Sequence, residues 1–174
     1  LNHIPLPFED SSLDAVYEVQ VFSYCKNLTN LFKDIHRMLK PGGKLALLEW
    51  VRLSNYSPEN PHHAQLLKRI KPLVGAIGTP SIEEYTTALK AAGFEILINE
   101  NVSIDGLQAP LIENADRFFK RLTRTIHFLN KWRLIPKHFK PLFDRLTKDG
   151  EAFVEADRLR IVTTSHYIIA KKPI

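Results

Sequence analysis

The amino-acid sequence predicts an α/β fold built on a doubly wound sheet with a helical insertion. Between residues 13 and 102, segments rich in β-branched and aromatic residues alternate with segments whose apolar residues recur at helical spacing. One strand-like segment, residues 44–51, is apolar enough to suit a strand that is covered on both sides. A sheet built in this way binds its ligand at the carboxyl ends of its strands.

The first elements follow this alternation closely. Residues 13–23 are rich in valine and aromatic residues and predict a strand. A helix is expected over about 28–39, where apolar residues recur at helical spacing. The string Lys40-Pro41-Gly42-Gly43 then ends the helix and starts the next strand. The apolar run Leu-Ala-Leu-Leu then predicts a strand over 44–51.

The middle of the chain contains a long connection and a strongly predicted helix. Residues 52–80 hold four prolines and two glycines, which predicts a loop with a short helix around 62–70. The capping box Ser-Ile-Glu-Glu at 81–84 starts a helix that Gly93 closes, and its buried stripe comprises Ile82, Tyr85, Ala88, Leu89 and Ala92. Residues 94–102 predict the next strand.

The last part of the chain is mainly helical. An amphipathic pattern predicts a helix from about 113 to 131. Pro136 and Pro141 punctuate a shorter helical piece, residues 151–160 predict a last helix, and residues 161–171 predict a final strand.

The composition limits the class of protein. The chain has 174 residues, 44% of them hydrophobic and 25% charged, which fits one globular domain with one core. No apolar run approaches the roughly 20 residues that span a bilayer, and the first residues lack the layout of a secretory signal. Cys25 is the only cysteine, so an intrachain disulfide and a thiolate metal cluster are excluded. We expect a cytoplasmic protein, soluble or peripheral to a lipid surface.

The positive charge is concentrated in residues 117–145. This stretch has nine basic residues and a single acidic residue, Asp144, interleaved with six aromatic residues. Three interpretations are open: a helical lid that buries its aromatic residues, contact with an anionic membrane, or contact with nucleic acid. The lid is favoured, and no nucleic-acid partner is expected.

Several strings resemble a known family. Residues 4–17, Ile-Pro-Leu-Pro-Phe-Glu-Asp-Ser-Ser-Leu-Asp-Ala-Val-Tyr, and residues 36–43, His-Arg-Met-Leu-Lys-Pro-Gly-Gly, resemble the second half of a Rossmann-like class I S-adenosylmethionine-dependent methyltransferase. More narrowly, the chain looks like the sterol 24-C-methyltransferases in residues 49–51, 55–56, 59–62 and 88–97. The likeness covers most of residues 1–105 and returns weakly at 167–173.

The resemblance also implies parts that this sequence lacks. In that fold, a glycine-rich turn after the first strand holds the cofactor S-adenosylmethionine, and an acidic residue after the second strand holds its ribose. Neither feature occurs in this sequence. We expect a fragment, a split protein or an incomplete chain, with the missing N-terminal half or a partner chain supplying the glycine-rich cofactor loop. The strand at 14–23 would then have an edge without a neighbouring strand, and such an edge favours aggregation or partner binding.

The resemblance implies three cofactor-binding residues. Asn2 stands where relatives place an aspartate that accepts from the adenine amine, and the backbone N–H of His3 would meet an adenine nitrogen. Gln20 stands where sterol methyltransferases carry a glutamate near the cofactor. Each of the three has an alternative as an ordinary loop or strand residue.

The chemistry implied by the family requires no metal and no nucleophilic side chain. An alkene carbon attacks the sulfonium methyl group, a carbocation forms, a hydride shifts, and a base removes a proton. Glu49, at the carboxyl end of its strand, is the candidate charge stabiliser or general base, with a purely hydrogen-bonding role as the alternative. Tyr24, where the family tends to have histidine, would orient substrate or relay a proton, or else pack in the core. His62 and His63 have no second group at metal-site spacing.

Five aromatic residues are candidate substrate-binding residues. Phe22, Trp50 and Tyr56 would line an apolar pocket or support a cation, or else be buried in the core. Phe118 and Phe119 would line a lid over an apolar substrate.

The leading hypothesis divides the chain into three parts. Residues 1–106 form the C-terminal half of the methyltransferase core, 107–160 the helical lid, and 161–174 the final strand. The expected function is S-adenosylmethionine-dependent methylation, at carbon, of a sterol, triterpenoid or other bulky apolar small molecule, at the endoplasmic reticulum or another lipid surface. The alternatives are a noncatalytic subunit that completes or regulates a partner, and a rearrangement or cyclisation without methyl transfer. A homo-oligomer is left open.

Overall fold

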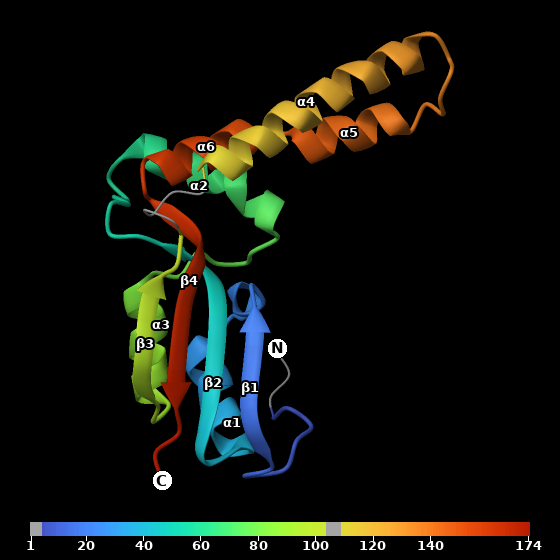
Figure 1. Ribbon diagram of the computed structural model, residues 1–174. Coiled ribbons are helices and arrows are strands. Elements are labelled where there is room, and N and C mark those ends of the chain that lie inside the picture. The colour runs from blue at the N-terminus through green and yellow to red at the C-terminus, as the bar shows by residue number, and fades with distance from the viewer. Residues whose placement is uncertain (1–4, 104–108) are drawn as a thin grey trace.

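The fold is built on one four-stranded sheet, shown in the computed structural model of Figure 1. The structure describes residues 5–103 and 109–174. The strands lie in the order β1-β2-β4-β3, and their bounds are β1 Leu13–Val19, β2 Leu39–Arg52, β3 Glu95–Asn101 and β4 Val162–Lys171. β1 and β2 are parallel, whereas β4 is antiparallel to both β2 and β3. The predicted α/β class is confirmed, and the last strand of the chain lies inside the sheet.

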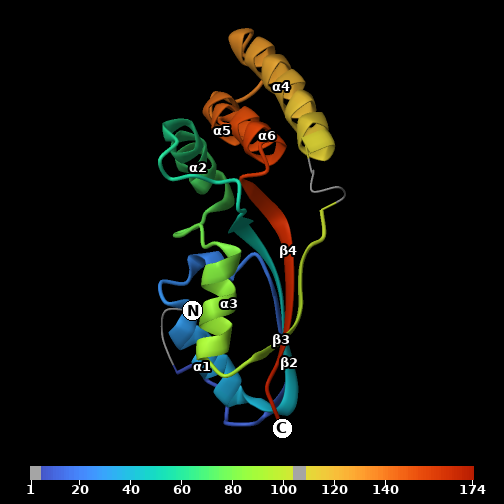
Figure 2. The ribbon, with the colours of Figure 1, turned by 90° about the vertical axis from the view of Figure 1, so that its left-hand side faces the viewer.

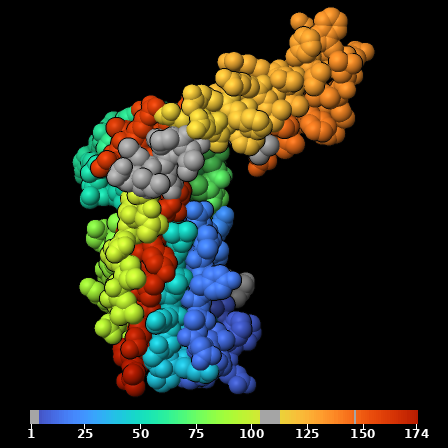
Figure 3. All heavy atoms as spheres, viewed as in Figure 1, coloured from blue at the N-terminus to red at the C-terminus, as the bar shows by residue number. Residues whose placement is uncertain are grey.

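Two helices cover one face of this sheet. α1 (Leu28–Met38) and α3 (Ile82–Ala91) pack side by side on that face, as Figure 2 shows. The opposite face, which is toward the viewer in Figure 3, carries no helix of the described chain. The expectation that 44–51 is covered on both sides was therefore wrong for this chain: Leu45 and Leu47 are buried beneath the helices, while Ala46 and Leu48 on the other face are half-buried.

The first strand is shorter than the sequence predicted. β1 ends at Val19 rather than at Ser23, because Gln20 adopts a left-handed backbone conformation with a φ of 55°. The chain then forms a short 3-10 helix, η1 (Phe22–Tyr24), that leads to α1. The left-handed residue breaks the extended backbone and turns the chain away from the sheet.

The second strand begins earlier than predicted. β2 starts at Leu39, so the Pro-Gly-Gly string lies within the strand rather than before it. The register between β1 and β2 shifts in this region, and Gly42 has a φ of 78°. A Cβ atom on Gly43 would lie 2.8 Å from the backbone oxygen of Lys40. The two glycines therefore allow an irregular strand start that a larger residue would prevent.

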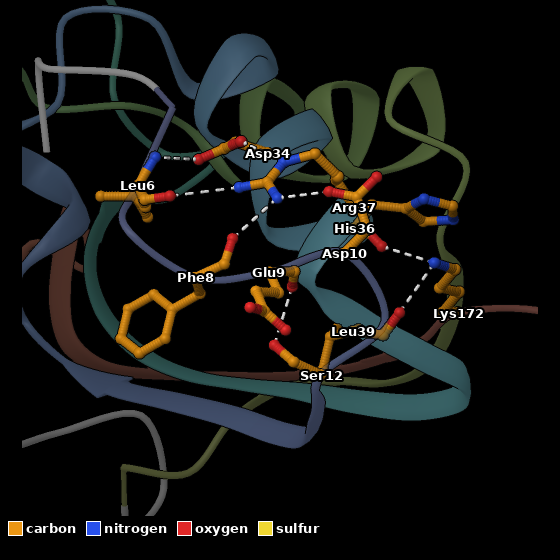
Figure 4. Close-up of polar contacts among 10 residues, drawn as sticks. All are labelled: Leu6, Phe8, Glu9, Asp10, Ser12, Asp34, His36, Arg37, Leu39 and Lys172. Atoms are coloured by element: carbon orange, nitrogen blue, oxygen red, sulfur yellow. Dashed lines mark hydrogen bonds and ion pairs between the residues drawn. The ribbon is translucent and has the colours of Figure 1, made fainter.

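A polar clamp holds the segment before β1 against α1 (Figure 4). Asp34 is buried, and its carboxylate accepts a hydrogen bond from the Leu6 N–H at 2.6 Å. The Arg37 guanidinium donates to Asp34 at 2.8 Å, to Asp10 at 2.6 Å and to the backbone oxygens of Leu6 and Phe8. The two strings that carry the methyltransferase resemblance thus contact each other through Arg37.

Lys172, which follows β4, contacts the same C-terminal end of α1. The Lys172 ammonium donates to the backbone oxygens of His36 and Leu39 at 2.8 and 2.7 Å (Figure 4). These carbonyl groups lie where a helix leaves its last acceptors unpaired, and a cation there also opposes the helix dipole. The residues after β4 therefore help to end α1.

The buried apolar residues form two clusters rather than the one core expected from composition. The first lies between the sheet and the helices α1 and α3 and includes Phe32, Leu47 and Leu89. The second lies beyond the end of the sheet, where α2 (Pro61–Val74) and α6 (Gly150–Arg158) pack around Trp50. The predicted helices near 62–70 and 151–160 are confirmed, and α2 is longer than expected.

The remaining helices form an antiparallel hairpin. α4 (Ala109–Lys131) and α5 (Phe139–Thr147) pack along each other and project away from the sheet (Figures 1 and 3). None of their side chains that the structure describes is buried. Within the described ranges, no helix has both the length and the apolar character that crossing a membrane requires.

The capping box that starts α3 gives a direct test of this fold. The Ser81 hydroxyl accepts from the Glu84 N–H at 3.2 Å, and the Glu84 carboxylate accepts from the Ser81 N–H at 2.6 Å. Ser81→Ala should lower the free energy of unfolding by about 1 kcal/mol, because one N–H of the first turn loses its partner. Chemical denaturation measures this change. Thr87→Ala, at an exposed position of the same helix, is the control, and equal losses in both variants would refute the capping role.

Candidate functional site

Two carboxyl groups meet at the carboxyl ends of the parallel strands β1 and β2. Glu49 of β2 is only 1% exposed. Its Oε1 accepts from the Phe22 N–H at 2.5 Å, and its Oε2 accepts from the Trp50 N–H at 3.2 Å. The 3-10 helix after β1 therefore places a backbone donor directly on Glu49, and Glu49 lies at the sheet edge that the sequence predicted.

The second carboxyl group belongs to Glu18 of β1. Its Oε2 accepts from the Val21 N–H at 2.8 Å, and its carboxyl group lies close enough to that of Glu49 for the two to interact electrostatically. Burial and the adjacent Glu49 raise the pKa of Glu18 from 4.5 to about 8. Burial also raises the pKa of Glu49, although the Phe22 N–H opposes this shift. At neutral pH Glu18 therefore keeps a proton, and burial favours proton retention by Glu49 as well.

Tyr85 of α3 lies against this pair. Its side chain is fully buried, and burial together with Glu49 and Glu18 holds the pKa of its phenol far above the ordinary value. Its hydroxyl makes no hydrogen bond of ordinary geometry to the described residues. A neutral hydroxyl without a standard partner, next to a carboxylate, leaves one donor available at the site.

Sequence reasoning missed Glu18 and the polar role of Tyr85. The sequence predicted that Tyr85 lies in the buried stripe of its helix, and the structure confirms this. The helical spacing did not predict that its hydroxyl faces Glu18 and Glu49. The sequence did contain one indication of Glu18: it is an acidic residue in an apolar strand, and it lies two positions after Val16 and hence on the same face of the strand. An inward-facing acid needs a partner, and that argument would have singled out Glu18.

The other predicted polar residues have hydrogen bonds elsewhere. The Tyr24 hydroxyl donates to the Val74 oxygen at 3.2 Å, and it lies so close to Gly75 that a Cβ there would be 2.6 Å away. Tyr24 thus joins η1 to the end of α2. The exposed Gln20 donates from Nε2 to the Thr164 oxygen at 3.0 Å and so joins the end of β1 to β4. Asn2 and His3 lie outside the described residues.

The predicted aromatic residues are spread over three places. Phe22 is 4% exposed and packs edge-on against Phe32 in the first core. Trp50 is 1% exposed and belongs to the second core. The ring of Tyr56 lies 5.3 Å from the Arg52 guanidinium carbon, so this ring already contacts a cation of the protein itself.

The two phenylalanines of α4 are largely solvent-exposed. Phe118 is 62% and Phe119 is 40% exposed, and their rings contact each other edge-on. Phe119 also lines a small hollow at the base of the hairpin with Leu73 and Phe153. The role of both residues in a substrate-binding lid stays a prediction.

An open groove of about 820 Å³ is lined by residues other than the carboxyl pair and Tyr85. It runs between the first residues of α1 and α3 and is lined by residues of both polar and apolar character, including Cys25, Leu28, Arg52, Pro80 and Ala88. Arg52 is paired with Glu84 at 2.6 Å on its wall. The described ranges contain no group of three histidine, cysteine, aspartate or glutamate side chains placed to hold a metal ion.

Comparisons with known proteins agree with this geometry. A protein family described as a methyltransferase domain matches residues 2–47. A sterol 24-C-methyltransferase from Gibberella zeae is 29% identical over 99% of this chain and 51% of its own length. The chain resembles the sterol 24-C-methyltransferases. A cycloartenol-C-24-methyltransferase from Arabidopsis thaliana is 30% identical over 99% of the chain and 55% of its own length.

These matches confirm the predicted resemblance. The chain spans about half the length of the curated relatives it matches. Among solved structures, mycolic acid cyclopropane synthase CmaA1 aligns with a TM-score of 0.63 at 18% identity, covering 94% of this chain and 56% of that chain. The [4+2]-cyclase SpnF aligns with a TM-score of 0.60 at 22% identity, covering 97% and 53%. The chain thus has the fold of part of a class I methyltransferase.

The carboxyl pair predicts an unusual dependence of stability on pH. Between about pH 4.5 and pH 8, folded Glu18 keeps a proton that the unfolded chain releases, so the free energy of unfolding should fall as the pH rises. His36 and His166, whose pKa values are lowered by burial, act in the opposite direction. Glu18→Gln should therefore show a smaller loss of stability with rising pH than the unmodified chain.

Chemical denaturation across this pH range, with Glu59→Gln as an exposed control, measures the effect. A Glu18→Gln curve parallel to that of the unmodified chain would show that the two carboxyl groups do not share a proton.

Proposed function

We propose that this chain forms the substrate-facing half of an S-adenosylmethionine-dependent methyltransferase that methylates carbon in a sterol, triterpenoid or similar apolar molecule. The observation that carries the proposal is the buried, hydrogen-bonded carboxyl group of Glu49 at the carboxyl ends of two parallel strands, in a chain that matches sterol 24-C-methyltransferases over 99% of its length. Ligands of doubly wound sheets bind at this edge.

The residues present suit a positively charged cofactor. S-adenosylmethionine, when bound, supplies an electrophilic methyl group on a sulfonium centre. Glu49 is the carboxyl group proposed to carry the matching negative charge, and the exposed turn at Gln20 gives access to the end of β1 from solvent. Asn2 and His3 are the proposed adenine contacts, with Gln20 near the cofactor. The glycine-rich loop would come from a missing N-terminal half or from a partner chain.

Glu49 is proposed to act through its charge rather than by taking a proton. With 1% exposure and hydrogen bonds from two backbone N–H groups, its carboxylate is fixed in position and shielded from water. A fixed negative charge in a dry site stabilises developing positive charge strongly, because the surroundings need not reorganise. Glu18 keeps the proton that prevents two adjacent negative charges, and Tyr85 is the proposed further donor.

The remaining candidates are assigned to substrate binding. Tyr24 would orient the substrate where η1 meets α2, and Phe22, Trp50 and Tyr56 would shape the apolar wall behind it. Phe118 and Phe119 would contribute from the helical lid, for which we propose the bounds 107–160. An apolar substrate of this kind is consistent with a peripheral location at the endoplasmic reticulum or another lipid surface.

The edge strand favours a second candidate function. Within the described sheet β1 has β2 as its one neighbour, and on β1 Tyr17 is 82% and Val19 57% exposed. An open edge with apolar residues can pair with another polypeptide or with a second copy of this chain. The chain would then be a methyltransferase-like subunit that completes or regulates a partner.

Substitution of Glu49 tests the proposed mechanism. In the complete enzyme that contains this chain, Glu49→Gln should lower kcat with cycloartenol by about 100-fold, because the neutral amide cannot stabilise positive charge. The affinity for S-adenosylmethionine, measured by calorimetry, should change far less. Glu49→Asp, which restores the charge, should recover part of kcat.

Glu100→Gln, an exposed change on β3, is the matched control. Unchanged turnover in a folded Glu49→Gln protein would remove Glu49 from the mechanism. Product mass distinguishes the reaction type: a product that lacks an added methyl group would favour rearrangement or cyclisation, the kind of reaction named for SpnF.

Calorimetry on the 174-residue chain separates the two candidate functions. Binding of S-adenosylmethionine only after a second polypeptide is added, together with complex formation in size-exclusion chromatography, supports completion by a partner. A well-folded monomer that binds the cofactor alone would contradict the subunit interpretation.

A further inference from the structure

The far end of the α4–α5 hairpin exposes a cluster of large apolar side chains. Phe128, Trp132 and Leu134 are 59%, 63% and 68% exposed, and the rings of Phe128 and Trp132 lie 6.2 Å apart. The hairpin projects away from the sheet, so this end is distant from both cores (Figures 1 and 3). Solvent exposure of three adjacent large apolar side chains is unfavourable unless another apolar phase covers them. We call residues 128–137 the hairpin tip.

The charge around the tip has a single sign. Lys131, Arg133 and Lys137 are exposed within it, and the neighbouring Arg124 is exposed on α4. The one acidic residue between 117 and 145, Asp144, is already paired: Lys140 donates to it at 2.7 Å and His127 contacts it at 2.5 Å. The outward charge that remains on the hairpin is therefore positive.

This combination identifies the chemistry of the partner. Exposed aromatic and leucine side chains next to lysine and arginine match an interface with an apolar layer beneath negatively charged groups. Nucleic acid offers the negative charge and base faces for stacking, but no apolar layer for Leu134, which is the most exposed of the three. An acidic protein surface would rarely combine dense negative charge with an apolar phase deep enough for all three side chains.

We propose that the hairpin tip is a docking surface for an anionic lipid bilayer. Phe128, Trp132 and Leu134 enter the boundary between headgroups and acyl chains, while the basic residues contact the anionic headgroups. The inference does not depend on methyl transfer, because the binding measurement requires neither cofactor nor substrate.

Vesicle binding tests the proposal on the unmodified 174-residue chain. The chain should co-float with phosphatidylcholine vesicles that contain phosphatidylserine, and much less with pure phosphatidylcholine. Binding should weaken as salt is added. Changing Lys131, Arg133 and Lys137 to Gln should lower the partition coefficient about fivefold for each residue. Lys33 and Lys90, which are exposed on the helices that cover the sheet, provide the matched charge control.

Tryptophan fluorescence reports on the tip directly. The chain has two tryptophans, and Trp50 is 1% exposed, so a blue shift on adding anionic vesicles must come largely from Trp132. Trp132→Phe should remove the shift but keep binding, because the apolar ring is retained. The double variant Phe128→Ser, Trp132→Ser should bind at least tenfold less, whereas Phe8→Ser, at a 50% exposed phenylalanine before β1, should bind normally.

Three kinds of result would overturn the proposal. One is the absence of binding to anionic vesicles by the folded chain. Another is an equal loss of binding in the tip and control variants, which would indicate an effect spread over the whole surface. The third is a concentration-dependent dimer that shields Trp132 without lipid, or tip-dependent binding to nucleic acid in place of vesicles, because either would assign the surface to a different occupant.

Discussion

The carboxyl pair of Glu18 and Glu49 is the constraint on which the rest of the site depends. Two adjacent, largely buried carboxyl groups cannot both be ionised without a large free-energy penalty, so the pair must retain a proton or separate. The turn after β1 makes this arrangement workable, since it directs the N–H groups of Val21 and Phe22 onto the two carboxyl groups. The left-handed Gln20 that ends the strand is therefore also what places these donors.

Around this pair the molecule has two parts with different surfaces. The sheet and its covering helices bury a conventional core, whereas the hairpin of α4 and α5 keeps its aromatic residues and its positive charge in contact with solvent. The hairpin tip is distant from both cores, so a lipid surface bound there would not lie against the strand ends.

The sequence predicted the features that depend on local patterns. The capping box at 81–84 and the apolar spacing of 28–39 each act through neighbouring residues, and the structure bears them out. The predictions that failed concerned features that depend on contacts between residues far apart in the sequence. The end of β1 depends on one backbone torsion at Gln20, and the uncovered sheet face depends on which elements are present. Glu18 became visible as a site residue only once β1 and β2 were paired beside each other.

The position of β4 has a consequence for how the chain is made. β3 has β4 as its sheet neighbour, and β4 is the last strand in the sequence. During synthesis on the ribosome, β3 and the open flank of β2 must therefore wait, unpaired, until residues 162–171 emerge. Pairing of such late, distant segments is slow and leaves strand edges exposed in the meantime. Loss of residues 162–171 would split the sheet into the parallel pair of β1 and β2 and an unpaired β3.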